Sequence, residues 1–406
     1  MTCKSDQTAR WRLIVDDARL VGSRPRAVIR GVFVRGALAR VGRAHALWPS
    51  VDAPTHLVDL NAPEGAEWLR ATFETNSRRV PVSAATWNAL RARGLLIGVP
   101  SGLALEAAQA GLGRPLRGAR LHGYSPSASA SKIMCFAFEE GASVPSVVIR
   151  GMADPLDDTA LRREVEMVAA MRARVEQVPA LRDALPLVPL HHGIVRGDYV
   201  VVEAPDPFAP GTGRAGRDAS LRWLEIFQQA TTTSTDPWTA ADGERALGAL
   251  AGAAERAPSQ MERAIPAVRR RTEELVDSPV RRCAQHGDYW QGNLAEQGGS
   301  LRVYDWEWAE FDGLPFLDRW TYELGPLRDV ARSRPQPWVV EALASAAARI
   351  EAELGRSGMD GRFALATLVP ALTHLLFRQR AERARPGGWE PSAPALLDAA
   401  TALVAG

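Results

Sequence analysis

The pattern of apolar and polar residues predicts a β-rich first half and a helical second half. Short runs rich in β-branched and aromatic residues, each bounded by Gly, Pro, Asn or Asp, predict strands. These runs cover residues 11–15, 27–34, 56–60, 132–138, 145–150 and 198–203. Among them, apolar residues at three- and four-residue spacing predict helices. These helical segments are 65–74, 83–93 and 157–175.

A Pro- and Gly-rich segment, 204–216, follows and predicts a linker between two lobes. Beyond it, helical spacing dominates. The predicted helices cover 220–230, 240–257, 261–275, 337–354 and 362–384. One short β-rich island interrupts them at 284–308. The order of a β-rich lobe, a hinge and a helical lobe predicts an α+β protein.

The composition excludes several classes of protein. The 406 residues are 46% hydrophobic and 24% charged, which excludes a disordered, collagenous or coiled-coil chain. Lys and Arg number 49 against 47 Asp and Glu, so we expect no nucleic-acid partner held by a broad basic face. Three scattered cysteines, a polar N-terminus and no apolar stretch of membrane-spanning length predict a cytoplasmic protein with no membrane partner.

The island carries the residues that suggest chemistry. Its sequence over 285–308 is QHGDYWQGNLAEQGGSLRVYDWEW, in which a Gly-Gly turn predicts a tight hairpin. The hairpin would bring Asn293, at the start of one strand, beside Asp305, at the end of the other. Asp288 lies five residues before Asn293, on the preceding loop. Three oxygen-bearing side chains are therefore expected to converge.

These three side chains suit phosphoryl transfer. Carboxylate and amide oxygens bind a hard cation such as Mg²⁺, and a further carboxylate can receive a proton from an acceptor hydroxyl. The pair Asp288 and Asn293 taken alone is better explained as two turn-capping residues. The whole combination of HGD, Asn five residues later, the Gly-Gly hairpin and Asp-Trp-Glu at its end is far more specific.

HGDYWQGNL followed by VYDWEWAEFDGLPFLD resembles the aminoglycoside phosphotransferase and choline kinase group of kinase-like enzymes. The resemblance is strong in the island and loose elsewhere between residues 116 and 400. It implies a bilobal protein-kinase-like fold with an ATP-binding small lobe, 116–204, and a helical catalytic and acceptor-binding large lobe, 205–406. Residues 1–115 are then either an extra N-terminal α/β module of unknown role or an extension that packs on the small lobe.

The resemblance also implies roles for residues of the large lobe. Asp288 would be the catalytic base, and Asn293 and Asp305 would be the Mg²⁺ ligands. His286 would be the structural histidine of the catalytic loop. Asp318 would cap and support this loop without touching substrate.

In the small lobe the resemblance implies an ATP site. The loop 123–131 would cover the phosphates with backbone N–H groups and the hydroxyls of Ser127, Ser129 and Ser131. A plain linker is the alternative for this loop. Glu164 would be the carboxylate that pairs with the phosphate-binding lysine, or else an exposed helix residue. Residues 201–204, with Glu203 among them, would be the hinge whose backbone contacts adenine.

One residue departs from the family pattern. Arg150 stands where the family has the phosphate-binding lysine, and its planar guanidinium is not equivalent to an ammonium. Lys132, on the neighbouring strand, is the alternative cation. Two functions therefore follow: a phosphotransferase, or a catalytically weak or inactive nucleotide-binding or scaffold protein of the same fold.

The expected acceptor is a hydroxyl of a small molecule, such as an aminosugar, an amino alcohol or a sugar-like compound. Glu307, Glu310 and Asp312 follow the predicted metal ligand and either favour a cationic acceptor or are surface charges. A protein kinase is disfavoured, because Trp306-Glu307 stands where that family has Phe-Gly.

Overall fold

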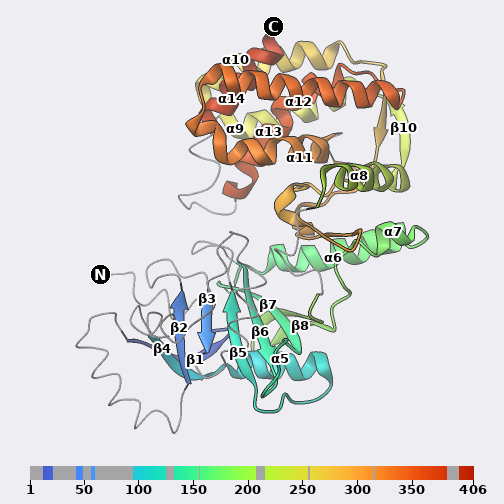
Figure 1. The fold of residues 1–406 in the computed structure, drawn as a ribbon. Helices are drawn as coiled ribbons and strands as arrows, with labels where there is room; N and C mark the ends of the chain where they lie inside the picture. The colour runs from blue at the N-terminus through green and yellow to red at the C-terminus, as the bar shows by residue number, and fades with distance from the viewer. Residues whose placement is uncertain are drawn as a thin grey trace. The chain divides into compact units, whose positions relative to one another are not determined.

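Two compact units make up the chain in the computed structural model (Figure 1). The β-rich unit comprises residues 1–166 and 187–213, and the helical unit comprises 167–186 and 214–406. The predicted α+β class is confirmed. The structure describes residues 12–21, 43–48, 56–59, 95–124, 132–154, 156–206, 215–254, 257–313, 316–381 and 393–406. The strand predicted at 27–34 and the helices predicted at 65–74 and 83–93 lie outside these residues.

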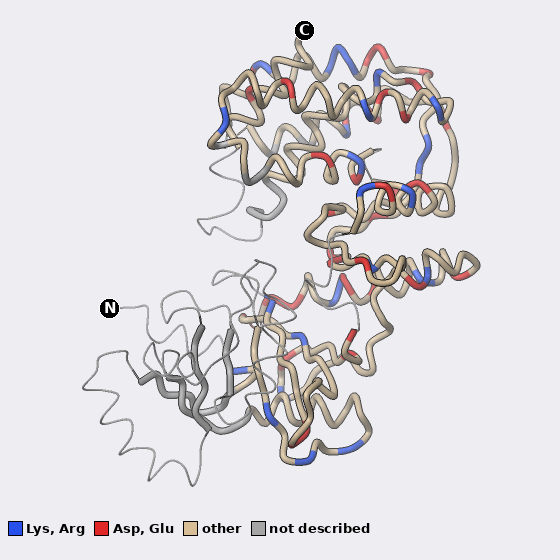
Figure 2. The backbone as a smooth tube through the Cα atoms, in the orientation of Figure 1, with Lys and Arg blue, Asp and Glu red and all other residues tan. Residues whose placement is uncertain are grey.

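Basic and acidic residues are interspersed along the described helices of both units (Figure 2). None of the helices in the described part is long and apolar enough to cross a bilayer.

The β-rich unit is built on one nine-stranded sheet with the order β1-β4-β2-β3-β5-β6-β7-β9-β8. Every neighbouring pair of strands is antiparallel. The strands are β1 (Val15–Val21), β2 (Arg43–Trp48), β3 (His56–Asp59), β4 (Leu95–Pro100), β5 (Arg120–Tyr124), β6 (Lys132–Phe138), β7 (Val147–Met152), β8 (His191–Val195) and β9 (Asp198–Glu203).

The strands before residue 115 extend the sheet of the predicted small lobe. The junction is the pairing of β3 with β5, in which His56 lies opposite Tyr124 and Leu57 opposite Gly123. The described N-terminal strands belong to the same sheet, and the two arrangements expected for the N-terminal residues both stay predictions. A division of the chain at residue 115 stays a prediction.

Helix α5 (Gly102–Leu112) covers one face of the strands and was not predicted. Its apolar residues pack with alternate buried residues of β6 such as Ile133 and Cys135. Gly102 and Gly111 weaken the helical signal, because glycine is a poor helix former. Gly111 lies so close to β9 that an added Cβ would stand 2.5 Å from Cγ1 of Val202. Packing against the sheet therefore requires a residue that lowers local helix propensity.

Helix α6 (Thr159–Val175) packs on other residues of the same strands. Leu161 and Val165 of α6 form a buried cluster with Met152, Tyr199 and Val201. The register places Met134 opposite Arg150 and Val148 opposite Glu203. Since side chains alternate along a strand, Lys132, Arg150 and Glu203 share the face of the sheet that packs against α6.

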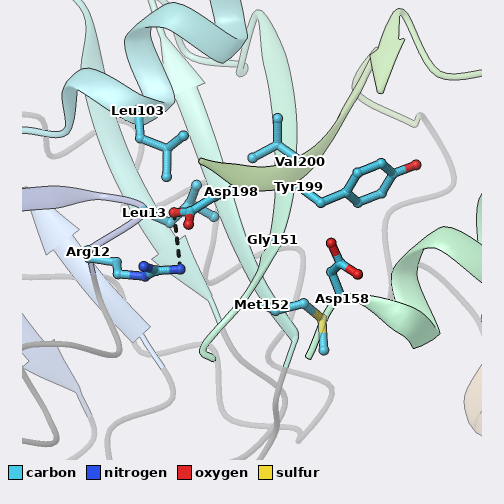
Figure 3. A pocket seen from close by; sticks show the side chains of 9 residues that line it. All are labelled: Arg12, Leu13, Leu103, Gly151, Met152, Asp158, Asp198, Tyr199 and Val200. Carbon is cyan, nitrogen blue, oxygen red and sulfur yellow. Dashed lines mark ion pairs between the residues drawn. The ribbon is translucent and has the colours of Figure 1, made fainter. Parts of the chain in front are cut away.

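The predicted strand at 11–15 is wrong for its first residues. Residues 12–14 form a turn, and β1 begins at Val15. Leu13 and Ile14 are buried in the same cluster as α5, so their apolar character reflects tertiary packing. Beside this turn lies a small pocket with the ion pair of Arg12 and Asp198 at 3.0 Å (Figure 3). Its lining residues are Arg12, Leu13, Leu103, Gly151, Met152, Asp158, Asp198, Tyr199 and Val200, and none of them is a predicted site residue.

The helical unit contains a bundle of helices and two short two-stranded sheets. Its helices are α7 (Pro179–Arg182), α8 (Arg217–Thr231), α9 (Ala240–Ala254), α10 (Pro258–Glu273), α11 (Leu317–Val330), α12 (Gln336–Arg356), α13 (Phe363–Ala381) and α14 (Ala393–Ala405). The sheets pair β10 (Ser234–Pro237) with β11 (Pro279–Arg282) and β12 (Leu294–Gln297) with β13 (Ser300–Val303). The predicted hairpin of the island is therefore confirmed as β12 and β13.

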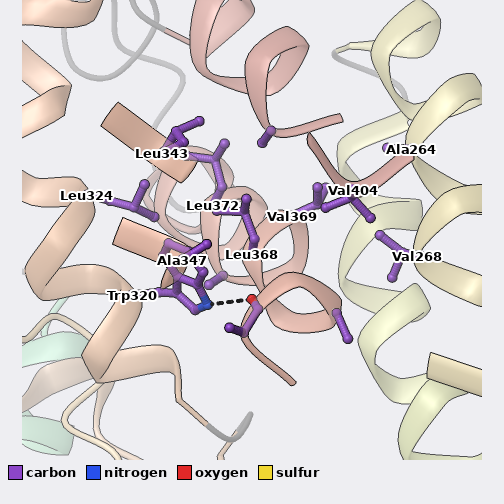
Figure 4. Packing of buried hydrophobic residues seen from close by; sticks show 14 of the residues in the cluster. Ala264, Val268, Trp320, Leu324, Leu343, Ala347, Leu368, Val369, Leu372 and Val404 are labelled. Atoms are coloured by element: carbon purple, nitrogen blue, oxygen red, sulfur yellow. Dashed lines mark hydrogen bonds between the residues drawn. The ribbon is translucent and has the colours of Figure 1, made fainter. Parts of the chain in front are cut away.

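One large apolar cluster holds the helices together (Figure 4). Trp320 of α11 is fully buried there, and its indole Nε1 donates a hydrogen bond to the carbonyl of Ala364 at 3.2 Å. Helices α11 and α14 were not predicted. Both are buried on more than one side, so they lack the single apolar stripe that marks a surface helix.

Candidate active site

The loop that carries Asp288 is held by a buried carboxylate. Asp318, in the first turn of α11, is completely buried. Its Oδ2 accepts a hydrogen bond from the backbone N–H of His286 at 2.6 Å, and its Oδ1 accepts one from Gly287 at 2.7 Å. Charge-assisted bonds of this kind are strong, so the backbone before Asp288 is fixed. Asp318 contacts the loop as predicted.

His286 links this loop to the end of the hairpin. Its Nδ1 accepts a hydrogen bond from the backbone N–H of Asp288 at 3.2 Å, and its Nε2 lies 2.8 Å from the carbonyl oxygen of Tyr304. With one ring nitrogen accepting and the other donating, the imidazole is the neutral tautomer with hydrogen on Nε2. The histidine thereby ties Asp288 to the residue that precedes Asp305.

Gly287 is required by both conformation and space. Its φ is +79°, a region that glycine enters without strain. A Cβ at this position would lie 2.3 Å from the carbonyl oxygen of Trp308. The HGD motif therefore has a structural reason for each of its first two residues.

The structure brings Asp288 and Asn293 into direct contact. The side-chain nitrogen of Asn293 donates to Oδ2 of Asp288 at 3.0 Å and to its carbonyl oxygen at 2.9 Å. The carbonyl oxygen of Asn293 accepts from the backbone N–H of Tyr304 at 2.9 Å. Asp305 follows Tyr304 directly, with φ of +65°, a conformation that aspartate tolerates better than most residues.

The donor set of Asn293 and Asp305 fits Mg²⁺. Because the amide nitrogen of Asn293 is bonded to Asp288, its amide oxygen is the atom that a cation can use. An amide oxygen with a carboxylate suits Mg²⁺, which keeps several water ligands and bonds to phosphate. Among the described residues there is no group of three or more His, Cys, Asp or Glu side chains that could hold a metal ion.

Aromatic side chains pack around the loop that carries Asp288. Trp223 stacks on Tyr289 and on Phe227, with ring centroids 5.6 and 5.0 Å apart. Trp306 meets the His286 ring edge-on at 4.5 Å. These rings are buried and rigid, so they hold the loop and the end of the hairpin in one arrangement.

A second cluster of charged groups lies in the β-rich unit and contains Arg150, Glu164 and Glu203. Nη1 of Arg150 is 2.9 Å from Oε1 of Glu164, and Nη2 is 2.8 Å from Oε1 of Glu203. Nζ of Lys132 is 3.0 Å from Oε2 of Glu164. Glu164 therefore pairs with two cations, and the expectation of an exposed helix residue is wrong.

Burial and charge act in opposite directions on these carboxyl groups. Burial alone would raise the pKa of Glu164, but the charges of Arg150 and Lys132 outweigh it and lower the pKa to about 2. Burial raises the pKa of Glu203 above its ordinary value, because Arg150 offsets it only in part. The pKa values of Glu164 and Glu203 are therefore shifted in opposite directions.

Sequence reasoning missed two contacts of this cluster. It placed Glu203 in the hinge through its backbone, whereas the side chain pairs with Arg150. It also left the direction of Lys132 open. The available signal for the directions of these side chains was the alternation along the two strands. Ile133 and Cys135 alternate with their neighbours in one strand, and Val200 and Val202 do so in the other. Ser127, Ser129 and Ser131 lie outside the described residues.

The acidic residues after Asp305 have several contacts. Oε1 of Glu307 accepts from the indole N–H of Trp308 at 3.1 Å, and the backbone of Glu310 pairs with Gln285. Asp312 is half exposed and lies 3.6 Å from Arg245. Both roles expected for these acidic residues, contacts with a cationic acceptor and surface charges, stay predictions.

The order of elements in the β-rich unit defines the class of fold. Arg150 lies on the third strand of the run β5, β6, β7, and the next helix, α6, carries Glu164. Two further strands, β8 and β9, complete this part of the sheet. A cation on the third strand paired with a glutamate on the following helix is the arrangement of a kinase-like small lobe. With the helical unit, the chain has a kinase-like α+β fold.

Comparisons with known proteins found similarities among solved structures. No protein-family model matches the chain, and no curated protein matches it. Among solved structures, it is similar to aminoglycoside phosphotransferase APH(4)-Ia in complex with ADP and hygromycin B, at 15% identity over 70% of this chain and 93% of that one, with a TM-score of 0.43. It is also similar to glucosamine kinase in complex with glucosamine, ADP and inorganic phosphate, at 15% identity, 67% and 81% coverage and a TM-score of 0.34. Both TM-scores are low, so neither similarity indicates a function.

Proposed function

We propose that this chain is an ATP-dependent, Mg²⁺-assisted phosphotransferase that transfers the γ-phosphate to a hydroxyl of a small aminosugar, amino alcohol or sugar-like acceptor. The observation that carries the proposal is the contact of Asp288 with Asn293 in a loop whose backbone is held by buried Asp318. An aspartate, an asparagine five residues later and a second aspartate are the working parts of kinase-like enzymes.

Asp288 is the proposed base. Its carboxylate accepts a hydrogen bond from the acceptor hydroxyl and receives the proton as the new oxygen–phosphorus bond forms, while the bond from the γ-phosphorus to the β–γ bridging oxygen breaks and ADP leaves with the electron pair. The bond from Asn293 holds this carboxylate in one orientation, which lowers the cost of positioning the reacting atoms. Asn293 and Asp305 would hold Mg²⁺, which when bound neutralises charge on the phosphates.

The β-rich unit is proposed to bind the nucleotide. Its cations on β6 and β7 would face the phosphates. Partly buried Tyr124, Met134 and Val148, packed against buried Phe136, offer apolar surface for an adenine ring. The loop 123–131 and the hinge 201–204 keep the roles predicted for them.

A second candidate function is nucleotide binding with little or no turnover. Arg150 favours it, because both of its Nη atoms are engaged by carboxylates. A guanidinium held in this way would have to give up a buried ion pair to contact a phosphate.

Purified protein with Mg·ATP and a panel of hydroxyl acceptors tests the proposal. We expect Asp288→Asn to lower phosphotransfer about a thousandfold, since general base catalysis contributes on this scale, and to keep nucleotide binding. Asp277→Asn is the matched control, because Asp277 is an exposed aspartate of the same unit that lies outside the proposed site. An unchanged rate in Asp288→Asn would show that the catalytic assignment is wrong. Nucleotide binding without turnover on any acceptor would favour the second candidate.

A further inference from the structure

Lysine is almost absent from this chain. Only two of its 49 basic residues are lysines, Lys4 and Lys132, and Lys132 is the one lysine among the described residues. Elsewhere arginine pairs with buried carboxylates, as Arg217, Arg319 and Arg349 do around Glu323. Arginine at position 132 would keep the charge and could bind Glu164 through two hydrogen bonds. The lysine therefore points to a task that suits an ammonium better than a guanidinium.

Lys132 and Arg150 reach the same carboxylate from neighbouring strands. Each takes one oxygen of Glu164, at 3.0 and 2.9 Å, and both lie on the face of the sheet that packs against α6. Lys132 is also the first residue after the Gly- and Ser-rich loop predicted to cover the phosphates. Its position therefore gives Lys132 the glutamate partner of a phosphate-binding lysine.

The two cations differ in the geometry of their hydrogen-bond donors. The guanidinium of Arg150 bridges Glu164 on α6 and Glu203 on β9, so its fork is fixed between two carboxylates, and these raise the pKa of Arg150 beyond its already high value. An ammonium is a compact charge with three donors, and it can contact a carboxylate and a phosphate oxygen together. The guanidinium of Arg150 is therefore suited to holding Glu164 in place. The ammonium of Lys132 is suited to contacting Glu164 and a phosphate oxygen together.

We propose that Lys132 is the residue that contacts the nucleotide phosphates, and that Arg150 is a positioning residue that fixes Glu164 for it. This inference rests on the proposed function. It explains why the departure from the family pattern at position 150 need not abolish activity. Lys132, on the neighbouring strand, supplies the ammonium, and Glu164 is its carboxylate partner.

The scarcity of lysine makes a direct test available. The probe is an acyl phosphate of ATP, in which the terminal phosphate carries an acyl group as a mixed anhydride. A deprotonated lysine amine beside that phosphate attacks the acyl carbon, the amide forms, and ATP leaves with the electron pair of the broken bond. Arginine gives no stable adduct, so mass spectrometry of peptides distinguishes Lys132 from Lys4. We expect Lys132 to be acylated at least tenfold faster than Lys4 and to be protected by excess Mg·ATP.

The outcomes separate this inference from the proposed function. Nucleotide binding with protected acylation of Lys132 supports both. If the full-length protein binds a fluorescent ATP analogue but Lys132 is not acylated, or reacts equally with an acyl phosphate that lacks adenosine, the inference is wrong and nucleotide binding stands. If no nucleotide binds, both fail. Lys4→Arg is the control and should leave acylation of Lys132 and turnover unchanged.

Variants provide an independent kinetic test. Lys132→Met leaves Glu164 paired with Arg150. We expect kcat to fall about a hundredfold with a much smaller change in nucleotide affinity, because a phosphate contact strengthens in the transition state. Lys132→Arg should restore little of the loss, whereas Arg150→Lys should keep most of the activity. Full turnover in Lys132→Met together with loss in Arg150→Lys would overturn the inference.

Discussion

Two buried glutamates, one in each unit, hold several cations and differ in the kind of cation. Glu323 on α11 pairs with Arg319 of its own helix, with Arg217 of α8 and with Arg349 of α12. Glu164 on α6 pairs with Arg150 and Lys132. Their side chains are almost equally buried, 3% and 4% exposed, so burial does not distinguish them.

The partners of the two glutamates distinguish their roles. The three arginines around Glu323 join three helices, and their planar forks suit a permanent carboxylate contact. The cluster around Glu164 combines one fixed arginine with one lysine at the start of a strand. We infer that the Glu323 cluster stabilises the helical unit, whereas the Glu164 cluster serves the nucleotide.

The largest expected effect is on stability in the helical unit. In Glu323→Gln the charge is lost, and Arg319, only 5% exposed, keeps Glu353 as its carboxylate partner. We expect the free energy of unfolding to fall by about 3 kcal/mol, because a buried ion pair loses one partner. Chemical denaturation followed by circular dichroism measures this change. A loss below about 1 kcal/mol would contradict a stabilising role.

The same cluster predicts a pH dependence. Burial would raise the pKa of Glu323, but its arginine partners outweigh burial and lower the pKa to about 2 from an ordinary 4.5. Because the folded-state pKa is lowered, the stabilisation is present above pH 4.5 and disappears as the pH falls toward 2. The expected loss is about 3 kcal/mol over this interval. Between pH 6 and 2 the free energy of unfolding should change less with pH in Glu323→Gln than in the native chain. An equal change with pH in both would count against the assignment.

Glu164→Gln should act on both activity and stability. The pKa of Glu164 is lowered to about 2, as that of Glu323 is, so the free energy of unfolding should fall by about 3 kcal/mol although Arg150 keeps Glu203 as a partner. Phosphotransfer should fall about a hundredfold, because Lys132 loses the carboxylate that orients it. The two measurements together test the comparison. A loss of stability with normal turnover would show that Glu164, like Glu323, has only a stabilising role.

The smallest expected effect is at the rim of the Glu323 cluster. The side chain of Arg349 is 48% exposed, and exposed ion pairs contribute little. We expect Arg349→Ala to lower the free energy of unfolding by about 0.5 kcal/mol. A loss as large as that in Glu323→Gln, measured by the same denaturation, would show that the exposed arginine carries the cluster.

Part of the candidate site could be predicted because its residues are close in sequence. Asp288, Asn293 and Asp305 lie within one loop and one hairpin, so turn chemistry alone brings the loop and the hairpin end together. The contact of Asp288 with Asn293 spans five residues. Asp318, 32 residues after His286, was predicted as a loop support only through the resemblance.

The charged cluster of the β-rich unit could not be predicted in the same way. Lys132 and Glu164 are 32 residues apart, and Arg150 and Glu203 are 53 apart. Their contacts depend on the register between β6, β7 and β9 and on the packing of α6. A shift of one residue in any pairing would turn a side chain to the other face of the sheet.

The sequence by itself determined the order of a β-rich and a helical part and the residues of the catalytic loop. Hydrophobic periodicity and turn residues depend on only a few neighbouring positions. They can therefore be recognised in the sequence without knowledge of tertiary contacts. Only the tertiary structure decided that Lys132 and Arg150 share Glu164, and that the N-terminal strands extend the same sheet. The physical reason is that the partner of a side chain is set by strand register and helix packing, which involve residues far apart in the chain.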